Sequence, residues 1–181
     1  MTTRDRDTSL GMGVYFSPDD YVGITRRIVI LGIDLAVLIT VYVLFAVLLI
    51  PIAGERSGSV GLLYIGFVWA YLTVLKSSRL RTVGYRLMGA RIINLRGRRP
   101  SMLRMTFRLL LWMFGPFNLL FDLLWSSFDD DHQTLRDRFA GTCVVNSQAD
   151  PVGTAEIQLK YYYAFGFALM YSRVMRPLHV D

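Results

Sequence analysis

The chain has 181 residues, of which 53% are hydrophobic, 13% aromatic and 19% charged, with a net charge of +6 and a mean hydropathy of +0.38. This length is room for one domain. Its single cysteine, Cys143, excludes an intrachain disulfide, and its two histidines, His132 and His179, lack metal-ligand spacing, so we expect neither a metal site nor a cofactor. A charged fraction below the roughly 25% of average soluble chains is compatible with a membrane protein, and the placement of the apolar residues decides.

Residues 1–20 form a polar N-terminal segment of mixed charge, without the apolar core of a signal peptide. Residues 28–50 then carry one ionisable group, Asp34, over a length of ~34 Å as a helix, which is enough to cross a hydrocarbon core of about 30 Å. We expect an uncleaved membrane helix over about 27–51, ended by Pro51 and Gly54. Residues 57–75 carry no charge, so a second helix over about 57–76 completes an antiparallel hairpin.

The segment 76–104 contains basic residues and no acidic one. Basic loops stay in the cytoplasm, which predicts a cytoplasmic N-terminus as well, because Arg26 and Arg27 precede the first helix. The stretch ARIINLRGRRPS predicts a short strand and a turn at Gly97. Interleaved aromatic residues and a recognised motif are missing, so nucleic acid is not an expected partner. Anionic lipid headgroups are the expected partner of this loop.

A third apolar segment, over about 103–128, contains Arg108 and Asp122 and is broken by Gly115-Pro116. It is either one kinked span or two half-helices of a re-entrant hairpin, which would have to be covered by protein. A fourth segment, 157–175, either crosses the membrane or lies in the interface with its tyrosines among the headgroups.

These segments predict an all-α integral membrane protein, a small bundle of three to four transmembrane or re-entrant helices. A basic cytoplasmic loop would hold a short β element. Within the chain, residues 21–147 would form the membrane domain and residues 148–181 a C-terminal amphipathic or transmembrane helix.

Arg27 and Asp34 lie seven positions apart, so on a helix they share a face, ~10 Å apart along the axis. Helical side chains lean toward the N-terminus, so Arg27 leans away from Asp34, and each is expected to find its partner on another segment. An Asp at the centre of a span costs about 2.5–3.5 kcal/mol on insertion scales. Such a residue commonly serves an ion pathway or proton relay. The alternative is a structural role, in which Asp34 ties helices together through hydrogen bonds.

Three motifs resemble the RDD family of membrane proteins. Arg27 and Asp34 in RRIVILGID match its first two signature residues, and TVGYRLMGARIIN is similar to its T-x-G-x-x-L-x-G-x-R-V-V stretch. LRDRFAGTCVV resembles its L-H-D-x-x-A-G-T-x-V-V ending, with Asp137 as the second signature aspartate and Arg136 where the family commonly has His. Supporting positions in and around the matched stretch are Arg26, Thr82, Gly84, Arg86, Arg91, Asp122 and Arg136.

The resemblance implies transport of unidentified ligands, with cation/proton exchange proposed for some members, and a bacterial cytoplasmic membrane. It also implies that Arg27, Asp34 and Asp137 form a functional trio. We hypothesise that Arg27 pairs with Asp137 at the cytoplasmic membrane surface. That pairing favours the re-entrant alternative for the third segment, because a single crossing would leave Asp137 on the far side.

Two functions are carried forward. The first is transport of a small ion or solute by an oligomer, with Asp34 as the titratable group. The second is a non-transporting membrane scaffold, whose charged residues fix helix packing and whose basic loop binds lipid or a partner protein. An enzyme is not expected, since the sequence shows no constellation of nucleophile and base and no metal-ligand set.

Overall fold

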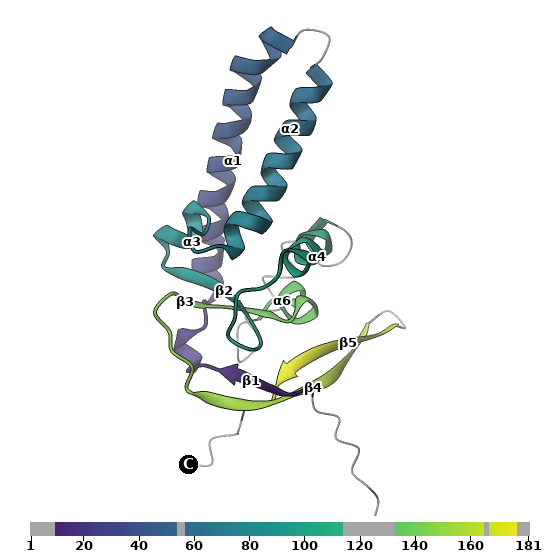
Figure 1. The fold of residues 1–181 in the computed structure, drawn as a ribbon. Coiled ribbons are helices and arrows are strands. Elements are labelled where there is room, and N and C mark those ends of the chain that lie inside the picture. Colours follow the sequence, from purple (N-terminus) through teal and green to yellow (C-terminus); the bar gives the residue numbers. More distant parts are fainter. Residues whose placement is uncertain (1–9, 54–56, 114–132, 165–166, 177–181) are drawn as a thin grey trace, which may run out of the picture.

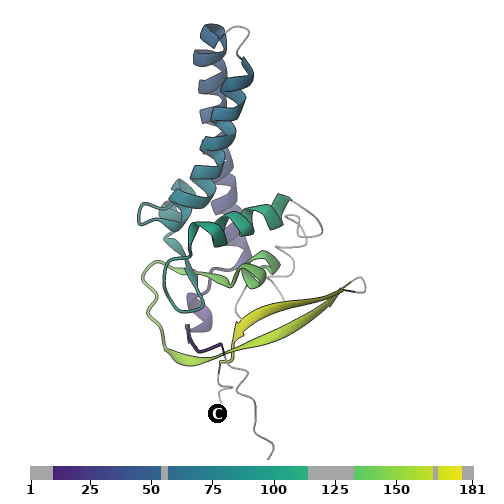
Figure 2. The same cartoon turned by 45° about the vertical axis from the view of Figure 1, so that its right-hand side comes forward.

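The computed structural model describes residues 10–53, 57–113, 133–164 and 167–176, and within them a long helical hairpin stands on a mixed α/β head (Figure 1). The hairpin consists of α1 (Ile24–Ala53), α2 (Ser57–Trp69) and the π-helical segment η3 (Ala70–Leu75), which continues α2. The head comprises the described residues of 10–23, 76–113 and 133–176. Seen from a second side, the hairpin still rises clear of the head (Figure 2).

Aromatic side chains join the two helices of the hairpin. Tyr64 of α2 donates its hydroxyl to the carbonyl of Leu38 at 3.0 Å and packs edge-on against Tyr42 at 5.1 Å between ring centroids. Phe45 of α1 packs against Phe67 of α2 at 6.3 Å between ring centroids. Edge-to-face packing of this kind adds to the area that the rings bury.

The outer surface of the hairpin is apolar and exposed. Two stretches, Ile24–Leu49 and Gly58–Leu75, are long and apolar enough to cross a membrane, and only 11% and 17% of their respective residue windows are buried. A core helix of a soluble protein would be mostly covered by protein. Exposed side chains of this length and hydropathy instead indicate helices that face lipid.

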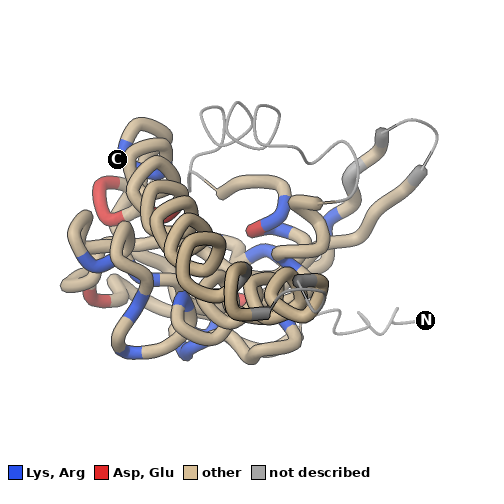
Figure 3. Tube along the Cα trace, turned by 90° about the horizontal axis from the view of Figure 1, so that it is seen from above, with Lys and Arg blue, Asp and Glu red and all other residues tan. Residues whose placement is uncertain are grey.

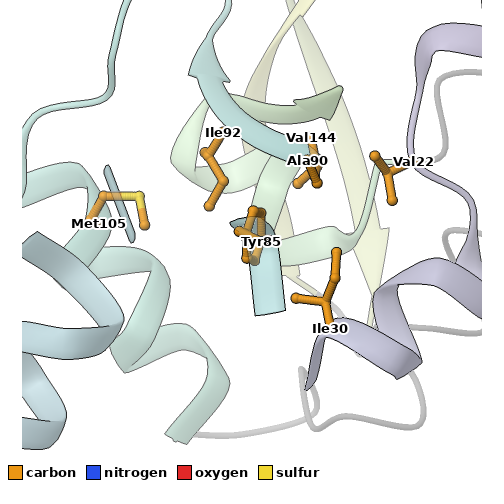
Figure 4. Packing of buried hydrophobic residues seen from close by; sticks show 7 residues of the cluster. All are labelled: Val22, Ile30, Tyr85, Ala90, Ile92, Met105 and Val144. Atoms are coloured by element: carbon orange, nitrogen blue, oxygen red, sulfur yellow. The ribbon is translucent and has the colours of Figure 1, made fainter. Parts of the chain in front are cut away.

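The head is built around the two-stranded antiparallel sheet of β2 (Ala90–Asn94) and β3 (Thr142–Asn146). Three helices accompany this sheet: α3 (Val83–Leu87), α4 (Met102–Met113) and α6 (Leu135–Ala140). Figure 4 shows Tyr85 of α3 in the middle of the core cluster. The cluster consists of Val22, Ile30, Tyr85, Ala90, Ile92, Met105 and Val144, so it joins the start of α1 to the sheet and to α4.

A three-stranded antiparallel sheet lies at the end of the head away from the hairpin, in the order β1-β4-β5 (Figure 1). It pairs β1 (Met12–Tyr15) with β4 (Gly153–Ala164), and β4 with β5 (Phe167–Val174). A short 3-10 helix, η1 (Pro18–Asp20), links β1 to the segment that enters α1. The N-terminal and C-terminal parts of the chain therefore meet in one sheet.

The prediction of an all-α bundle is wrong. Within the described residues, the structure contains five strands in two antiparallel sheets beside its helices. The short β element expected in the basic loop is present as β2, and Gly97 lies in the turn after it with φ +72°. This strand pairs with β3, which lies about fifty residues later in the chain. No pattern within the basic loop could predict that partner.

The prediction of an amphipathic or transmembrane helix within 148–181 is also wrong, because this range contains β4 and β5 and its apolar segment 157–175 forms most of both. The reason is the alternation of buried and exposed side chains at the start of β4, where Ala155 and Ile157 are buried while Thr154 and Glu156 are exposed. A period of two is typical of a half-buried strand, and the neighbouring tyrosines favour strands as well. The helix was predicted from the apolar content of the segment, which does not report this alternation.

The helix predicted over about 103–128 begins as α4, and residues 114–132 lie outside the described part of the chain, including Asp122 and Gly115-Pro116. The two flanks of that gap are informative. Both α4 and α6 belong to the head and contact each other at the base of the hairpin (Figures 1 and 2). The two helices that flank residues 114–132, α4 and α6, therefore lie on the same side of the hairpin.

Candidate functional site

One face of the first turns of α1 carries the buried residues Arg27, Ile30 and Asp34. Their spacing of three and four residues places them in a single stripe along the helix. From Leu35 to Leu49, by contrast, every described side chain of α1 is half-buried or exposed. The stripe thus marks where the helix passes from protein contacts in the head to an apolar exposed surface, with Asp34 at the boundary.

Asp34 is 3% exposed and accepts three hydrogen bonds from other segments. Its Oδ2 accepts from the hydroxyl of Thr82 at 2.8 Å. Its Oδ1 accepts from the hydroxyl of Tyr71 at 2.9 Å and from the backbone N–H of Gly84 at 2.8 Å. All three donors are uncharged, and within the described residues no ion pair to Asp34 within 4.0 Å is found. The expectation that Asp34 has its partners on other segments is confirmed.

The π-helical turn η3 positions the tyrosine at this site. Tyr71 and Thr73 are its buried residues, and π-helical turns occur frequently at functional sites. The hydroxyl of Tyr71 also accepts the backbone N–H of Val83 at 3.1 Å, so the tyrosine links Asp34 to the start of α3.

Gly84 is required by the close approach of α3 to α1. A Cβ atom at this position would lie 2.5 Å from the carbonyl oxygen of Ile30 and 2.9 Å from Oδ1 of Asp34. Only a residue without a side chain allows its N–H to reach the carboxylate. This gives a physical reason for a glycine in the TVGYRLMGARIIN motif.

Asp137 is fully buried and forms two ion pairs, which is a different environment from that of Asp34. Its Oδ2 accepts from Arg27 Nη1 at 2.7 Å, and its Oδ1 accepts from Arg108 Nη2 at 2.6 Å. The pair predicted between Arg27 and Asp137 is confirmed. Arg27 also donates from Nε to the carbonyl of Val22 at 2.8 Å, which fixes its guanidinium beside the helix start.

Neutral groups complete the environment of Asp137. The residue closes a capping box with Thr134 at the start of α6, because each side chain accepts the backbone N–H of the other. Thr142 donates its hydroxyl to Oδ1 at 3.3 Å. Burial would raise the pKa of Asp137, but the guanidiniums of Arg108, Arg27 and Arg136 outweigh it and hold that pKa well below its usual range.

The remaining predicted positions lie around these two sites. Arg26 donates to Asn146 Oδ1 and to the carbonyl of Met88, and Arg91 donates to the carbonyl of Ala149, so both are tied to the head. Arg136 is half-buried on α6 and acts on Asp137 through its charge, while Arg86 is exposed on α3. Asp122 lies outside the described residues. The structure therefore brings Arg27 and Asp137 together and keeps Asp34 in a separate site on the same helix face.

Sequence reasoning missed Tyr71 at the Asp34 site and missed Arg108, Thr134 and Thr142 at the Asp137 site. Arg108 offered a signal, since a guanidinium inside an apolar segment needs an acidic partner. Tyr71 offered no signal, because the sequence does not distinguish it from the other aromatic residues of the same span, which serve packing.

A small cavity of about 50 Å³ lies between α1, η3, α4 and α6, with Lys76, Arg108 and Arg136 among its walls. The ammonium of Lys76 sits over the ring of Tyr85 at 4.8 Å from its centroid. Burial lowers the pKa of Lys76, and the charges of Arg108 and Arg136 lower it further. Across the described residues, no group of three His, Cys, Asp or Glu side chains is placed to hold a metal ion.

Comparison with known proteins adds one finding to this geometry. The model of the RDD family matches residues 21–141, a region that contains Arg27, Asp34 and Asp137 and covers more than half of the chain. No curated protein and no solved structure matches the chain.

Proposed function

Because the chain belongs to the RDD family and carries two exposed apolar helices of membrane-spanning length, we propose that it is a membrane transporter of a small ion or solute in which Asp34 takes up and releases a proton. The observation that carries this proposal is the set of partners around Asp34. All three are neutral donors, and two of them are hydroxyls.

A hydroxyl group can donate or accept, whereas a guanidinium has only donors and keeps its charge. When Asp34 is protonated on Oδ2, the hydroxyl hydrogen of Thr82 can turn away, and the new O–H can donate to the Thr82 oxygen along the same 2.8 Å contact. Both forms of Asp34 are thus satisfied with little rearrangement. The same proton on Asp137 would break two ion pairs.

The proposed orientation places the head in the cytoplasm of a bacterial cell, with the hairpin in its cytoplasmic membrane. Figure 3, the view along the hairpin, shows Lys and Arg positions distributed around its base. Nine of the 20 Lys and Arg residues belong to the segment 76–104, and such an excess favours the cytoplasmic side. Assembly of several copies is part of the proposal, because the two membrane helices found among the described residues offer little interior for a pathway.

The test uses the purified chain in vesicles that contain a pH-sensitive dye, with an imposed Na⁺ or K⁺ gradient. We expect proton flux in the wild type and in Asp150→Asn, which changes an exposed carboxylate, and none in Asp34→Asn. Thr82→Ser keeps the hydroxyl and should keep the flux, whereas Thr82→Val should lose most of it. Undiminished flux in a folded Asp34→Asn variant would contradict the role given to Asp34.

A second candidate is the non-transporting scaffold, and one observation favours it. The three donors to Asp34 come from η3, from Thr82 and from α3, so the carboxylate fastens the hairpin to the head. This candidate predicts no flux of Na⁺, K⁺ or H⁺ in the wild type. It also predicts a partner protein that co-purifies reproducibly with wild type.

A further inference from the structure

A second cavity, of about 300 Å³, lies beside the end of η3 and is lined by Lys76, Arg79, Arg81, Arg91 and Arg99. We call it the basic cavity. Its remaining lining comes from serines, isoleucines and a glycine, and none of its lining residues is acidic. The volume is at the lower end of the range for pockets that hold small molecules. Neither Asp34 nor Asp137 is part of it.

Two of the arginines are held in place by hydrogen bonds to backbone carbonyl groups. Arg81 donates from Nη1 to the carbonyl of Ala90 at 3.0 Å, and Arg91 donates from Nη2 to the carbonyl of Ala149. Each guanidinium has five N–H donors, so one such bond leaves most of its donor capacity for other groups. The Nε atom of Arg91 is buried and has no hydrogen-bond partner within the described residues.

The backbone at Arg81 is also unusual, because its φ of +58° lies in the left-handed region that favours glycine. Among the described residues, Arg81 is the only one other than glycine with a positive φ. Residues held in such conformations cluster at ligand clamps and other functional sites. Here the residue in the unfavourable backbone conformation is an arginine whose side chain lines the basic cavity. A glycine would adopt the same φ without strain but would bring no guanidinium.

Like charges gathered around one cavity repel one another, and an anion among them relieves that repulsion. Guanidiniums bind phosphate groups in particular, since the fork of N–H donors matches two phosphate oxygens at once. Lys76 directly follows Leu75, the last residue of the second membrane-spanning stretch. The basic cavity therefore opens near the level at which the phosphates of lipid headgroups lie, and it is also within reach of phosphates dissolved in the cytoplasm if the orientation proposed above holds.

We propose that the basic cavity is a binding site for a phosphate group, carried either by an anionic lipid or by a soluble phosphate. The site goes beyond the transport proposal, because it uses none of the groups that hold Asp34. Binding should therefore persist in the Asp34→Asn variant, whatever that variant does to flux.

The test uses the full chain in an uncharged maltoside detergent, which contains no phosphate, and titrates inorganic phosphate by calorimetry. Arg79 and Arg99 line the basic cavity and are exposed, so Arg79→Gln with Arg99→Gln should leave the protein folded. Arg96 and Arg98 are exposed in the same basic segment but do not line this cavity. Arg96→Gln with Arg98→Gln is therefore a control with the same loss of charge.

We expect the lining double variant to weaken phosphate binding about tenfold or more, and the control double variant to change it less than about twofold, since exposed charges act weakly at a distance. A second arm adds phosphatidylglycerol to the micelles. Displacement of phosphate by this lipid assigns the site to a headgroup, and unchanged phosphate binding assigns it to a soluble phosphate. Equal weakening in the two double variants, or no binding of either probe at millimolar concentration, would overturn the proposal.

Discussion

Asp34 and Asp137 are both buried carboxylates that contact α1 or belong to it, yet their partners differ in kind. Asp137 lies between two guanidiniums at 2.7 and 2.6 Å. Asp34 lies among a tyrosine hydroxyl, a threonine hydroxyl and a backbone N–H at 2.8 to 2.9 Å. Two carboxylates of nearly equal burial therefore have partners of different charge.

The difference teaches how each site responds to a proton. A carboxylate between fixed cations is held ionised, because neutralising it removes both ion pairs. A carboxylate among hydroxyls has partners that can reverse their hydrogen bonds. Asp137 thus holds the start of α1 to the head through two ion pairs, whereas two of the three partners of Asp34 are hydroxyls that can accept as well as donate.

The largest effect is expected for Asp137→Asn. The change keeps the shape of the side chain but removes the charge that pairs with Arg27 and Arg108, which are 7% and 5% exposed. Breaking a buried ion pair in this way costs about 3–5 kcal/mol. Thermal unfolding in detergent or lipid measures this loss.

Asp150→Asn is the matched control for that measurement, because Asp150 is exposed and changes the net charge equally. We expect it to alter the unfolding free energy by less than about 0.5 kcal/mol. Equal losses in the two variants would remove the distinction between Asp137 and an ordinary surface carboxylate.

The sequence was informative where a charge interrupts an apolar helix. The hairpin, the pairing of Arg27 with Asp137 and the strand within the basic loop were all predicted, because each leaves a local signal in hydropathy, charge or turn residues. The helix ends moved only slightly: α1 begins at Ile24 and runs through Pro51 to Ala53. A proline near the end of a helix removes one donor without stopping the last turn.

The remaining features depend on contacts between distant segments. The sheet of β2 and β3 joins Ala90 to Asn146, and the sheet of β1 and β4 joins Met12 to Glu156. No local pattern reports such pairings. The donors to Asp34 were hidden for the same reason, since Thr82 and Gly84 reach it across 48 and 50 residues. Their place in a motif marked them, but only the fold shows what they bind.

The second prediction concerns the close packing beside Asp34. In Gly84→Ala, the new methyl group would meet the carbonyl oxygen of Ile30 at 2.5 Å, so α3 must move away from α1. Overpacking of this kind costs about 1–3 kcal/mol, and the movement also lengthens the bond from the Gly84 N–H to Asp34. Unfolding measurements report the cost.

Gly32 serves as the control for that change. It also lies in a helix, and a Cβ there meets nothing within 4 Å. Gly32→Ala should leave stability unchanged or slightly raised, because alanine is the better helix former. If both alanine variants behave alike, the contact between α3 and α1 does not determine the site.

A smaller effect is expected for Asp34→Asn, although Asp34 is nearly as buried as Asp137. The amide oxygen can accept from Tyr71 and Gly84 in place of Oδ1, and the amide nitrogen can donate to the Thr82 oxygen once its hydroxyl turns. We expect a loss of about 1 kcal/mol or less, in the range of a single neutral hydrogen bond. A loss as large as that of Asp137→Asn would show that Asp34 is held as an ion and would contradict the role proposed for it.

The smallest effect is expected from pH in the range where the protein works, and it separates the two carboxylates once more. The folded pKa of Asp137 is depressed, so its contribution to stability is complete above the unfolded value of about 3.9 and is lost only as the pH falls below it. The difference in unfolding free energy between wild type and Asp137→Asn should therefore stay constant from about pH 8 to about pH 5 and shrink in stronger acid. A difference that already shrinks near neutral pH would mean that Asp137 takes up a proton there. In that case the two arginines do not fix its charge, and the contrast with Asp34 fails.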